Sequence, residues 1–289
     1  MNKLNIGTHV EKFVEWLSKI GEPVFHQMTK LIEFSVDTLQ SLLLAVSPFL
    51  IIAVLTVIMF LLKCRGSKLS FNKTRLKETL GLPLFCLLGL LLIYWMGFWQ
   101  EAIDTLVLVL VSTVIILMIG IPLGIWCAKQ SKVNFIVRPL LDFMQTMPAF
   151  VYLIPAILFF SVGNVPGVIA TIIFSLPPAV RMTSLGIKEV PPQIVEASVA
   201  FGCTSTQTLF KVQIPLAMPT ILAGVNQVIM LALSMVVISS MVGAGGLGES
   251  VYTGILQANI ALGFEAGLCV VILAIILDRA TQSLGKKNK

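Results

Sequence analysis

The sequence predicts an all-α integral membrane protein with about seven transmembrane helices, its N-terminus outside and its C-terminus in the cytoplasm. Hydrophobic residues make up 57% of the 289 residues and charged residues only 12%, a balance far outside that of a soluble globular domain. Residues 40–62 carry no charge. As a helix they would extend for about 35 Å, enough to cross a hydrocarbon core of about 30 Å. Lysine and arginine are concentrated in alternate loops, as the positive-inside rule describes.

Seven uncharged or nearly uncharged runs are the predicted spans: residues 40–62, 80–99, 103–127, 140–162, 164–185, 217–242 and 261–278. Five prolines interrupt the fourth and fifth runs: Pro148, Pro155, Pro166, Pro177 and Pro178. Because proline removes a backbone donor, a membrane helix tolerates it only where neighbouring groups compensate. Close helical packing is therefore expected around these two runs.

Residues 1–38 precede the first span and are expected to be amphipathic and extracytoplasmic. Apolar residues recur there at helical spacing beside charged ones: Val10, Phe13, Val14, Leu17 and Ile20, then Phe25, Met28, Leu31 and Ile32. Helices lying along the outer membrane surface fit this pattern. Packing against the protein's own helices is the alternative. No apolar stretch followed by a cleavage site is present, so a cleavable signal peptide is not expected.

Residues 39–100 are expected to form two accessory transmembrane helices joined by a basic cytoplasmic loop. The basic residues of this loop are Lys63, Arg65, Lys68, Lys73, Arg75 and Lys77. They suit a topology anchor. Alternatively, they could respond to ionic strength, because each such charge near an anionic leaflet is worth about 1 kcal/mol and is screened by salt. Residues 283–289 form the expected cytoplasmic tail.

No catalytic or metal-binding set is apparent. The five cysteines are scattered without a CxxC pair, and both histidines, His9 and His26, lie in the N-terminal tail. GAGGLG, residues 243–248, matches the dinucleotide fingerprint in letters, but it follows a predicted span rather than a strand. A tight turn is expected there instead. The chain lacks a GxxxxGK[ST] phosphate loop, so any ATP that drives it would be bound by another subunit.

A polar stretch, VEASVAFGCTSTQTLFKVQIPL at residues 195–216, separates the fifth and sixth predicted spans. Pro192 suits the first turn of a short helix, and Gly202 can end that helix in a left-handed cap. The side-chain oxygen of Thr204 can start a second short helix, which Pro215 would end. The sequence therefore predicts two small helices in the cytoplasm that could fill a groove in a partner. A loop packed only on its own bundle is the alternative.

The same stretch resembles the EAA motif of ABC importer permeases. Four residues match the motif in type and spacing: Glu196, Ala197, Gly202 and Pro215. Three others differ from it in size rather than in character: Ser198, Val212 and Ile214. Longer strings, at residues 142–160, 165–191, 210–237 and 272–282, are similar to the permease subunits of glycine betaine/proline betaine importers, which carry quaternary ammonium osmoprotectants.

This resemblance implies an ABC type I importer permease core over residues 101–282, with the coupling loop at residues 193–215. It implies a multi-pass transporter subunit of a bacterial cell membrane, not an enzyme, without a cofactor or metal of its own. The implied partners are a second copy of the permease, two cytoplasmic ATPase subunits that bind ATP and Mg, an extracytoplasmic substrate-binding protein and membrane lipids. No nucleic-acid partner is expected.

Two sets of site residues follow from the resemblance. The residues expected to couple to the ATPase are Glu196, Ala197, Phe201, Gly202, Leu209, Phe210 and Pro215. Among them, Glu196 is expected to anchor or cap the loop, and Phe201 and Phe210 to enter the groove of the ATPase. The candidates for the translocation pathway are Met144, Gln145, Met147, Asn226, Met230 and Ser234.

An ion-coupled carrier of small zwitterionic solutes, working without an ATPase, is the alternative function. Such a carrier would need an ionisable residue near the membrane midplane, where a charge costs at least about 2.5–3.5 kcal/mol. Asp104, Asp142 and Glu265 are the candidates, and all three lie close to the ends of predicted spans. Their positions favour the importer, and Glu265 is the residue that the alternative carrier would use.

Overall fold

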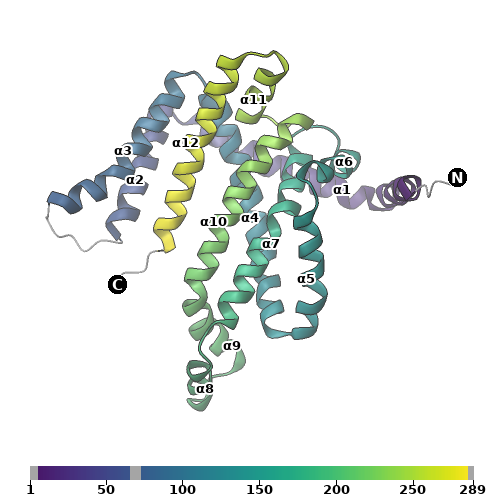
Figure 1. Ribbon diagram of the computed structural model, residues 1–289, viewed down its shortest axis with the longest axis vertical. Coiled ribbons are helices and arrows are strands. Elements are labelled where there is room, and N and C mark those ends of the chain that lie inside the picture. Colours follow the sequence, from purple (N-terminus) through teal and green to yellow (C-terminus); the bar gives the residue numbers. More distant parts are fainter. Residues whose placement is uncertain (1–5, 66–72, 286–289) are drawn as a thin grey trace.

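The computed structural model describes residues 6–65 and 73–285, which are almost entirely helical (Figure 1). The helices in chain order are α1 (Ile6–Ala45), α2 (Pro48–Arg65), α3 (Lys73–Trp95), α4 (Trp99–Lys129), α5 (Ser131–Thr146), α6 (Ala149–Phe160), α7 (Asn164–Lys188), α8 (Pro192–Ala200), α9 (Ser205–Thr208), a π turn (Leu209–Gln213), α10 (Ile214–Ser239), a 3₁₀ turn (Ser240–Val242), α11 (Leu247–Leu256) and α12 (Ile260–Gly285). No strand occurs in these ranges. The all-α prediction is confirmed.

Four helical stretches are long and apolar enough to cross a membrane: α4, α7, residues 205–242 with α10 at their centre, and residues 260–283 of α12. Two bent helix pairs also pass this test when each is counted as one span: α1–α2, bent by 102°, and α5–α6, bent by 100°. The described chain thus has four candidate spans, or up to six with the bent pairs. The predicted count of seven and the predicted sides of the two termini are not confirmed.

Two predicted spans are wrong as single helices. Residues 40–62 do not form one helix, because the helical backbone stops after Ala45 and starts again at Pro48, a residue that suits a first helical turn. Residues 140–162 break at Met147, whose extended backbone (φ −74°, ψ 139°) is the conformation favoured before a proline. In both places the chain changes direction by about a right angle.

The helix α7 stays intact although Pro177 and Pro178 lie within it. Both prolines are buried, and α4 and α10 pack along α7 more extensively than any other helix does. This is the close packing that the sequence predicts around the fifth span. In the fourth predicted span the two halves differ, since α5 buries only Leu141 whereas α6 buries Tyr152, Leu153, Ala156 and Phe160.

The helices α4 and α7 approach each other closely at two glycines of α4. A Cβ atom added at Gly124 would lie 2.6 Å from Cβ of Thr183 and 2.8 Å from the carbonyl oxygen of Val180. A Cβ atom added at Gly120 would lie 2.6 Å from Cβ of Ala179. Small residues at helix interfaces permit such close backbone contact in membrane proteins.

We expect Gly124→Val to force α4 away from α7 and to lower the free energy of unfolding by about 1–3 kcal/mol, as overpacking does in tight cores. Unfolding of the purified protein in detergent measures this effect. The matched control is Gly267→Val in α12, because no atom lies within 4 Å of a Cβ atom added there. Equal losses in the two variants would contradict the expectation.

The helix α1 runs nearly at right angles to α2 and packs beside the core (Figure 1). Its buried residues Ile32 and Val36 join the core cluster of α4 and α7, and the ring of Phe25 contacts those of Phe159 and Phe160. The opposite face exposes apolar side chains: Trp16, Ile20, Val24, Met28, Leu31 and Phe34. The alternative, packing against the protein's own helices, therefore holds for one face of α1. The exposed apolar face suits a membrane surface, and that position stays a prediction. The side chains of Val10, Phe13 and Leu17 lie outside the described residues.

A second core joins α2, α3 and α12. Its buried residues include Ile52, Met59, Leu90, Ile93 and Leu273. In the basic cluster of residues 63–77, only Lys63 has a described side chain, so the predictions for that loop lie outside the described residues.

Candidate functional site

The segment between α7 and α10 projects from one end of the molecule (Figure 1). We call residues 192–213 the knob. Pro192 begins α8, and Gly202 follows this helix with a left-handed backbone (φ +81°). Thr204 caps α9 with a capping box, in which its hydroxyl accepts from the N–H of Gln207 at 3.3 Å and its own N–H donates to Oε1 of Gln207 at 2.9 Å. The order of the two short helices, their starting signals at Pro192 and Thr204 and the end of the first at Gly202 are those that the sequence predicts.

Pro215 does not end the second short helix, so that prediction is wrong. A π turn at residues 209–213 leads directly into α10, and the helical stretch is continuous from Ser205 to Val242. In the π turn, the N–H of Ile214 bonds to the carbonyl of Leu209, five residues earlier. The wider turn lets the helix continue into a residue that has no N–H of its own.

The two halves of the knob are joined by buried contacts. The hydroxyls of Ser198 in α8 and Thr208 in α9 lie 3.1 Å apart and are buried. Leu209 is 4% exposed and packs with Ile187 at the end of α7 and Ala217 at the start of α10. Leu209 therefore supports the knob from within, and its side chain is not available for a groove contact.

The outer surface of the knob is apolar to an unusual degree for a segment outside the bundle. Phe201 is 89% exposed and Phe210 is 60% exposed. Val199 and Ile194 are also exposed. Glu196 and Ala197 lie on the surface as well, and in the described chain the Glu196 carboxylate makes no hydrogen bond or ion pair. The expected anchoring role of Glu196 is thus not seen within this chain. An exposed apolar cluster of this kind is typical of a protein interaction site.

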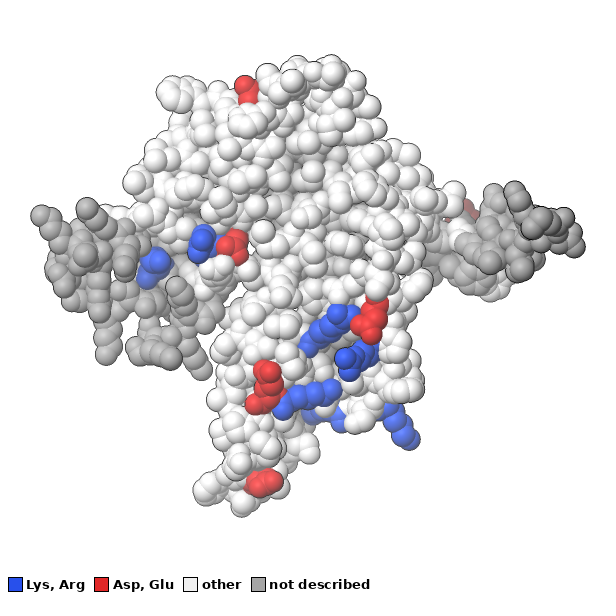
Figure 2. Space-filling view, viewed as in Figure 1, with Lys and Arg blue, Asp and Glu red and all other residues white. Residues whose placement is uncertain are grey.

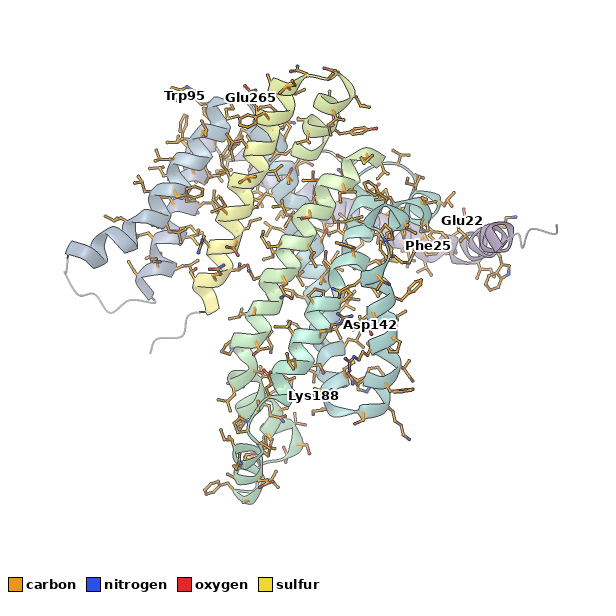
Figure 3. All side chains as sticks on the ribbon, in the orientation of Figure 1. Glu22, Phe25, Trp95, Asp142, Lys188 and Glu265 are labelled. Atoms are coloured by element: carbon orange, nitrogen blue, oxygen red, sulfur yellow. The ribbon has the colours of Figure 1, made fainter. Side chains whose placement is uncertain are left out.

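A polar contact joins α5 to α7 beside the break at Met147. The guanidinium of Arg181 donates to Oε1 of Gln145 at 2.6 Å and to Oδ1 of Asp142 at 2.5 Å. Figure 3 shows Asp142 on α5, next to α7. We predicted Gln145 on the translocation pathway from the sequence, but we did not predict a role for Arg181. The sequence does mark Arg181 as a candidate functional residue, because it is a cation within an otherwise apolar run.

The structure divides the six predicted pathway residues into separate groups. Gln145 bonds to Arg181, whereas Met144 and Met147 pack in two different apolar clusters near the bend. Asn226 faces α12, where its amide nitrogen donates to Asp278 at 2.9 Å and its oxygen accepts from Thr281 at 2.5 Å. On α10, Met230 and Ser234 are exposed. These side chains do not form one site within the single chain.

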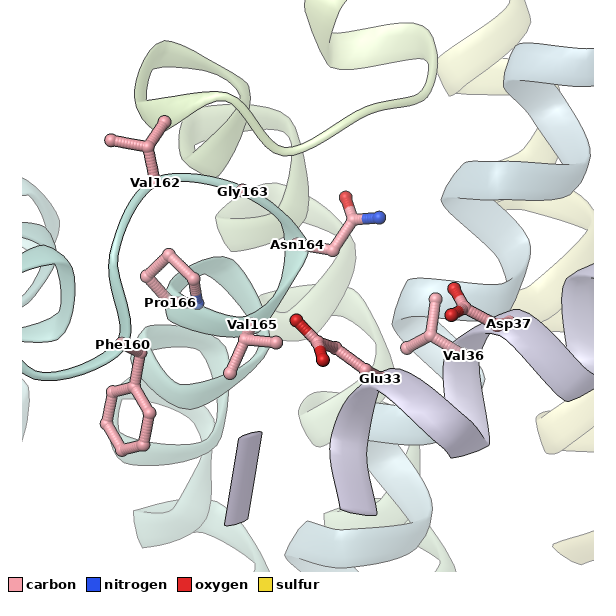
Figure 4. A pocket seen from close by; sticks show the side chains of 9 residues that line it. All are labelled: Glu33, Val36, Asp37, Phe160, Val162, Gly163, Asn164, Val165 and Pro166. Carbon is pink, nitrogen blue, oxygen red and sulfur yellow. The ribbon is translucent and has the colours of Figure 1, made fainter. Parts of the chain in front are cut away.

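A pocket of about 190 Å³ lies between α1 and the start of α7 (Figure 4). Glu33 and Asp37, one turn apart on α1, line one side of it, and the loop at Gly163 and Asn164 lines the other. Figure 4 shows both carboxylates directed toward this loop. The pocket lies at the end of α7 that is remote from the knob.

The GAGGLG segment forms a tight turn, as the sequence predicts. Gly243 and Gly246 have left-handed backbones, with φ of +84° and +99°. The N–H of Gly245 donates to Oδ1 of Asn164 at 3.0 Å, and the N–H of Leu247 donates to the hydroxyl of Thr105 at 2.8 Å. These bonds fix the turn against α7 and α4.

An all-helical chain with several membrane spans and an exposed apolar knob has the architecture of a transporter permease subunit. Within the described residues, no group of three or more His, Cys, Asp and Glu side chains could hold a metal ion.

The comparisons with known proteins agree with this class. Residues 120–289 match the family model of the binding-protein-dependent transport system inner membrane component. The chain belongs to this family and is a multi-pass, non-enzymatic permease subunit of an ABC importer in the bacterial inner membrane. The family implies an ATPase and a substrate-binding protein as partners.

Three curated relatives are permeases of named systems. GbuB of Listeria monocytogenes, a glycine betaine/carnitine transport permease protein, is 49% identical over 98% of this chain and 96% of its own length. OpuAB of Bacillus subtilis, a glycine betaine transport system permease protein, is 57% identical over 73% of this chain and 75% of its own. ProW of Escherichia coli, a glycine betaine/proline betaine transport system permease protein, is 44% identical over 97% of this chain and 75% of its own.

The fold has a solved counterpart in an inward-facing form of the MetNI methionine ABC transporter. That structure matches with a TM-score of 0.60 at 22% identity, over 67% of this chain and 96% of the matched chain. The predicted type I importer permease fold is confirmed. The comparisons support the importer over the alternative of an ion-coupled carrier.

Proposed function

We propose that this chain is the permease subunit of an ATP-driven importer of glycine betaine or a related compatible solute. The observation that carries the proposal is the identity to GbuB, 49% over 98% of the chain. OpuAB and ProW, which match at 57% and 44%, are also named for glycine betaine. The solute class of this chain is inferred from those names together with the extent of the matches.

In the proposed assembly, two copies of the permease pair across the membrane, and two cytoplasmic ATPase subunits bind ATP and Mg. Each ATPase docks on one knob, where the exposed Phe201 and Phe210 supply apolar contact area. An extracytoplasmic binding protein delivers the solute. Closure of the ATPase dimer then moves the knobs as rigid bodies, and α7 and α10 move with them.

The distribution of charge supports a cytoplasmic position for the knob. Figure 2 shows Lys and Arg side chains gathered toward that end of the molecule. Four basic residues lie at the knob end of the helices from α4 to α10: Lys129 ends α4, Lys132 is in the first turn of α5, Lys188 ends α7 and Lys211 lies in the knob. Cytoplasmic ends of membrane proteins carry such an excess. We accordingly propose an extracytoplasmic segment at 1–38, accessory helices at 39–100, the permease core at 101–282 and a cytoplasmic tail at 283–289.

Reconstitution tests the function directly. Vesicles containing this chain, its ATPase and its binding protein are expected to take up glycine betaine only when ATP is present on the ATPase side. A panel of glycine betaine, proline betaine, choline, carnitine and proline defines the solute class. Uptake driven by an ion gradient with this chain alone would contradict the importer, and ATP-driven uptake of none of the panel would contradict the solute class.

A further inference from the structure

Arg181 is a cation inside a membrane-spanning helix. It lies seven residues before Lys188, the last residue of α7. That separation corresponds to about 10 Å along the helix axis. A charge inside a span costs free energy unless it is paired, and charges that persist there usually serve a function. The partner of Arg181 is Asp142, and the side chain of Gln145 accepts a second bond.

The planar guanidinium of Arg181 fits two acceptors that lie on one face of α5. Asp142 and Gln145 are three residues apart, and residues at that spacing share one face of a helix. Nη2 of Arg181 donates a hydrogen bond to Asp142, and Nη1 donates one to Gln145. A planar fork with several donors holds two acceptors in fixed directions, whereas a lysine ammonium behaves as a single flexible charge.

Apart from this contact, α5 is attached to α4 and α7 by one apolar stripe, in which Leu141 is buried and Val133, Val137 and Met144 are partly buried. Most of its apolar side chains point away from the core, with Phe135 81% and Ile136 72% exposed. Leu141 alone is buried, in a small cluster with Cys127 and Val180. Among the described residues, three side-chain hydrogen bonds join α5 to other helices: the two from Arg181 of α7, and one at 2.6 Å from the hydroxyl of Tyr152 in α6 to the carbonyl oxygen of Met144. They hold the last turn of α5, immediately before the 100° bend into α6.

The helix α7 links Arg181 to the knob. The helix α7 ends at Lys188, and α8 begins four residues later at Pro192. Ile187, in the last turn of α7, packs with Leu209 of the knob. A displacement of the knob therefore acts on the part of α7 that lies within two helical turns of Arg181.

We propose that Arg181 is a positioning residue for transport, whose bonds to Asp142 and Gln145 fasten the bent pair α5–α6 to α7. Movement of the knob then reaches the bend at Met147 through this contact. The proposal rests on the function proposed above, because it needs a knob that an ATPase moves. It gives this ion pair a part in transferring movement from α7 to the bent pair, beside the apolar packing of Tyr152, Leu153 and Ala156 of α6 on Ala170 of α7.

The test is Arg181→Met in the complete importer, reconstituted with its ATPase and binding protein and assayed with glycine betaine. The maximal rate of uptake is expected to fall about tenfold, the scale on which residues between coupled sites alter coupling. ATP hydrolysis is expected to stay within about twofold and KM for glycine betaine to stay unchanged, as for a residue that acts on helix movement and not on binding of ATP or solute. The measured quantity is the number of solute molecules taken up per ATP hydrolysed, which is expected to be lower in Arg181→Met than in the unmodified importer.

Two comparisons make the result specific. Arg279→Met removes an exposed arginine of α12, whose Nε lies 3.9 Å from its neighbour Asp278, and is expected to leave the ratio of uptake to hydrolysis unchanged. The double variant Arg181→Asp with Asp142→Arg reverses the ion pair and is expected to recover most of the lost uptake.

Three outcomes would overturn the proposal: an unchanged ratio in Arg181→Met, a proportional loss of uptake and hydrolysis together with loss of the assembled complex, or no recovery in an assembled charge-reversed variant. A failure of the proposed function looks different. In that case the unmodified complex itself shows no ATP-driven uptake.

Discussion

Replacing Gly202 with valine is expected to uncouple ATP hydrolysis from solute uptake while the membrane part stays folded. Gly202 has φ +81°, and no atom lies within 4 Å of a Cβ atom added there. The effect is therefore one of backbone strain, because the left-handed conformation costs an L-residue about 1–2 kcal/mol and a β-branched residue is least suited to it. The chain can relieve this strain by changing the angle between α8 and α9, which moves Phe201 away from its contact.

The measurement compares uptake with ATP hydrolysis in reconstituted vesicles. In Gly202→Val, uptake is expected to fall about tenfold or more, since a small misplacement in a coupled assembly can cost up to a hundredfold. Gly202→Asn is the matched control, because asparagine adopts the left-handed conformation more readily, and it is expected to keep most of the uptake. Normal transport by Gly202→Val would show that the bend at Gly202 does not set the coupling geometry.

Replacing Phe201 with serine is expected to weaken the association of the permease with its ATPase. Phe201 is 89% exposed in the single chain, so a partner can bury nearly the whole ring. Complete burial of a phenylalanine side chain is worth about 1.5–3 kcal/mol. Affinity is therefore expected to fall about tenfold to a hundredfold, because each 1.4 kcal/mol corresponds to about tenfold.

Titration of the ATPase onto the permease in detergent or nanodiscs measures this affinity. Phe264→Ser is the matched control, because Phe264 is also exposed, at 70%, but lies at the start of α12, away from the knob. It is expected to bind the ATPase normally. If Phe201→Ser and Phe264→Ser bind the ATPase equally well, the knob is not the docking site that we propose.

The knob was largely predictable from sequence because its signals act on the residues beside them. A proline in the first turn, a glycine after the last turn and a threonine cap each determine the local backbone, whatever the rest of the chain does. Pro215 was the exception. A π turn lets the helix continue into this residue, and no local propensity signals that turn.

The breaks in the spans were harder to predict, because hydropathy is the same for a straight span and a bent pair. Met147–Pro148 breaks the helix, whereas Leu176–Pro177 does not. The two dipeptides differ in surroundings, since α7 is packed between α4 and α10 while α5 is mostly exposed. Tertiary packing overrides the preference of the residue before proline in one place and not in the other.

The hydrogen bonds of Arg181 and Asn226 were also hard to predict, because they depend on how the helices pack. The sequence shows opposite charges at Asp142 and Arg181 in two apolar segments. It does not show that α5 and α7 lie side by side in the register that brings these charges together. Asn226 was predicted on the pathway, yet α12 approaches α10 at that point and engages its amide.

The π turn also gives the knob two unequal connections to the membrane. On the side of α10 the helical backbone is unbroken through residues 205–242, whereas on the side of α7 the non-helical residues 189–191 intervene. The knob thus continues into α10 through an unbroken helix and into α7 through three non-helical residues, and the π turn is itself a type of position at which helices bend. The two helices attached to the knob therefore need not move by the same amount in one transport cycle.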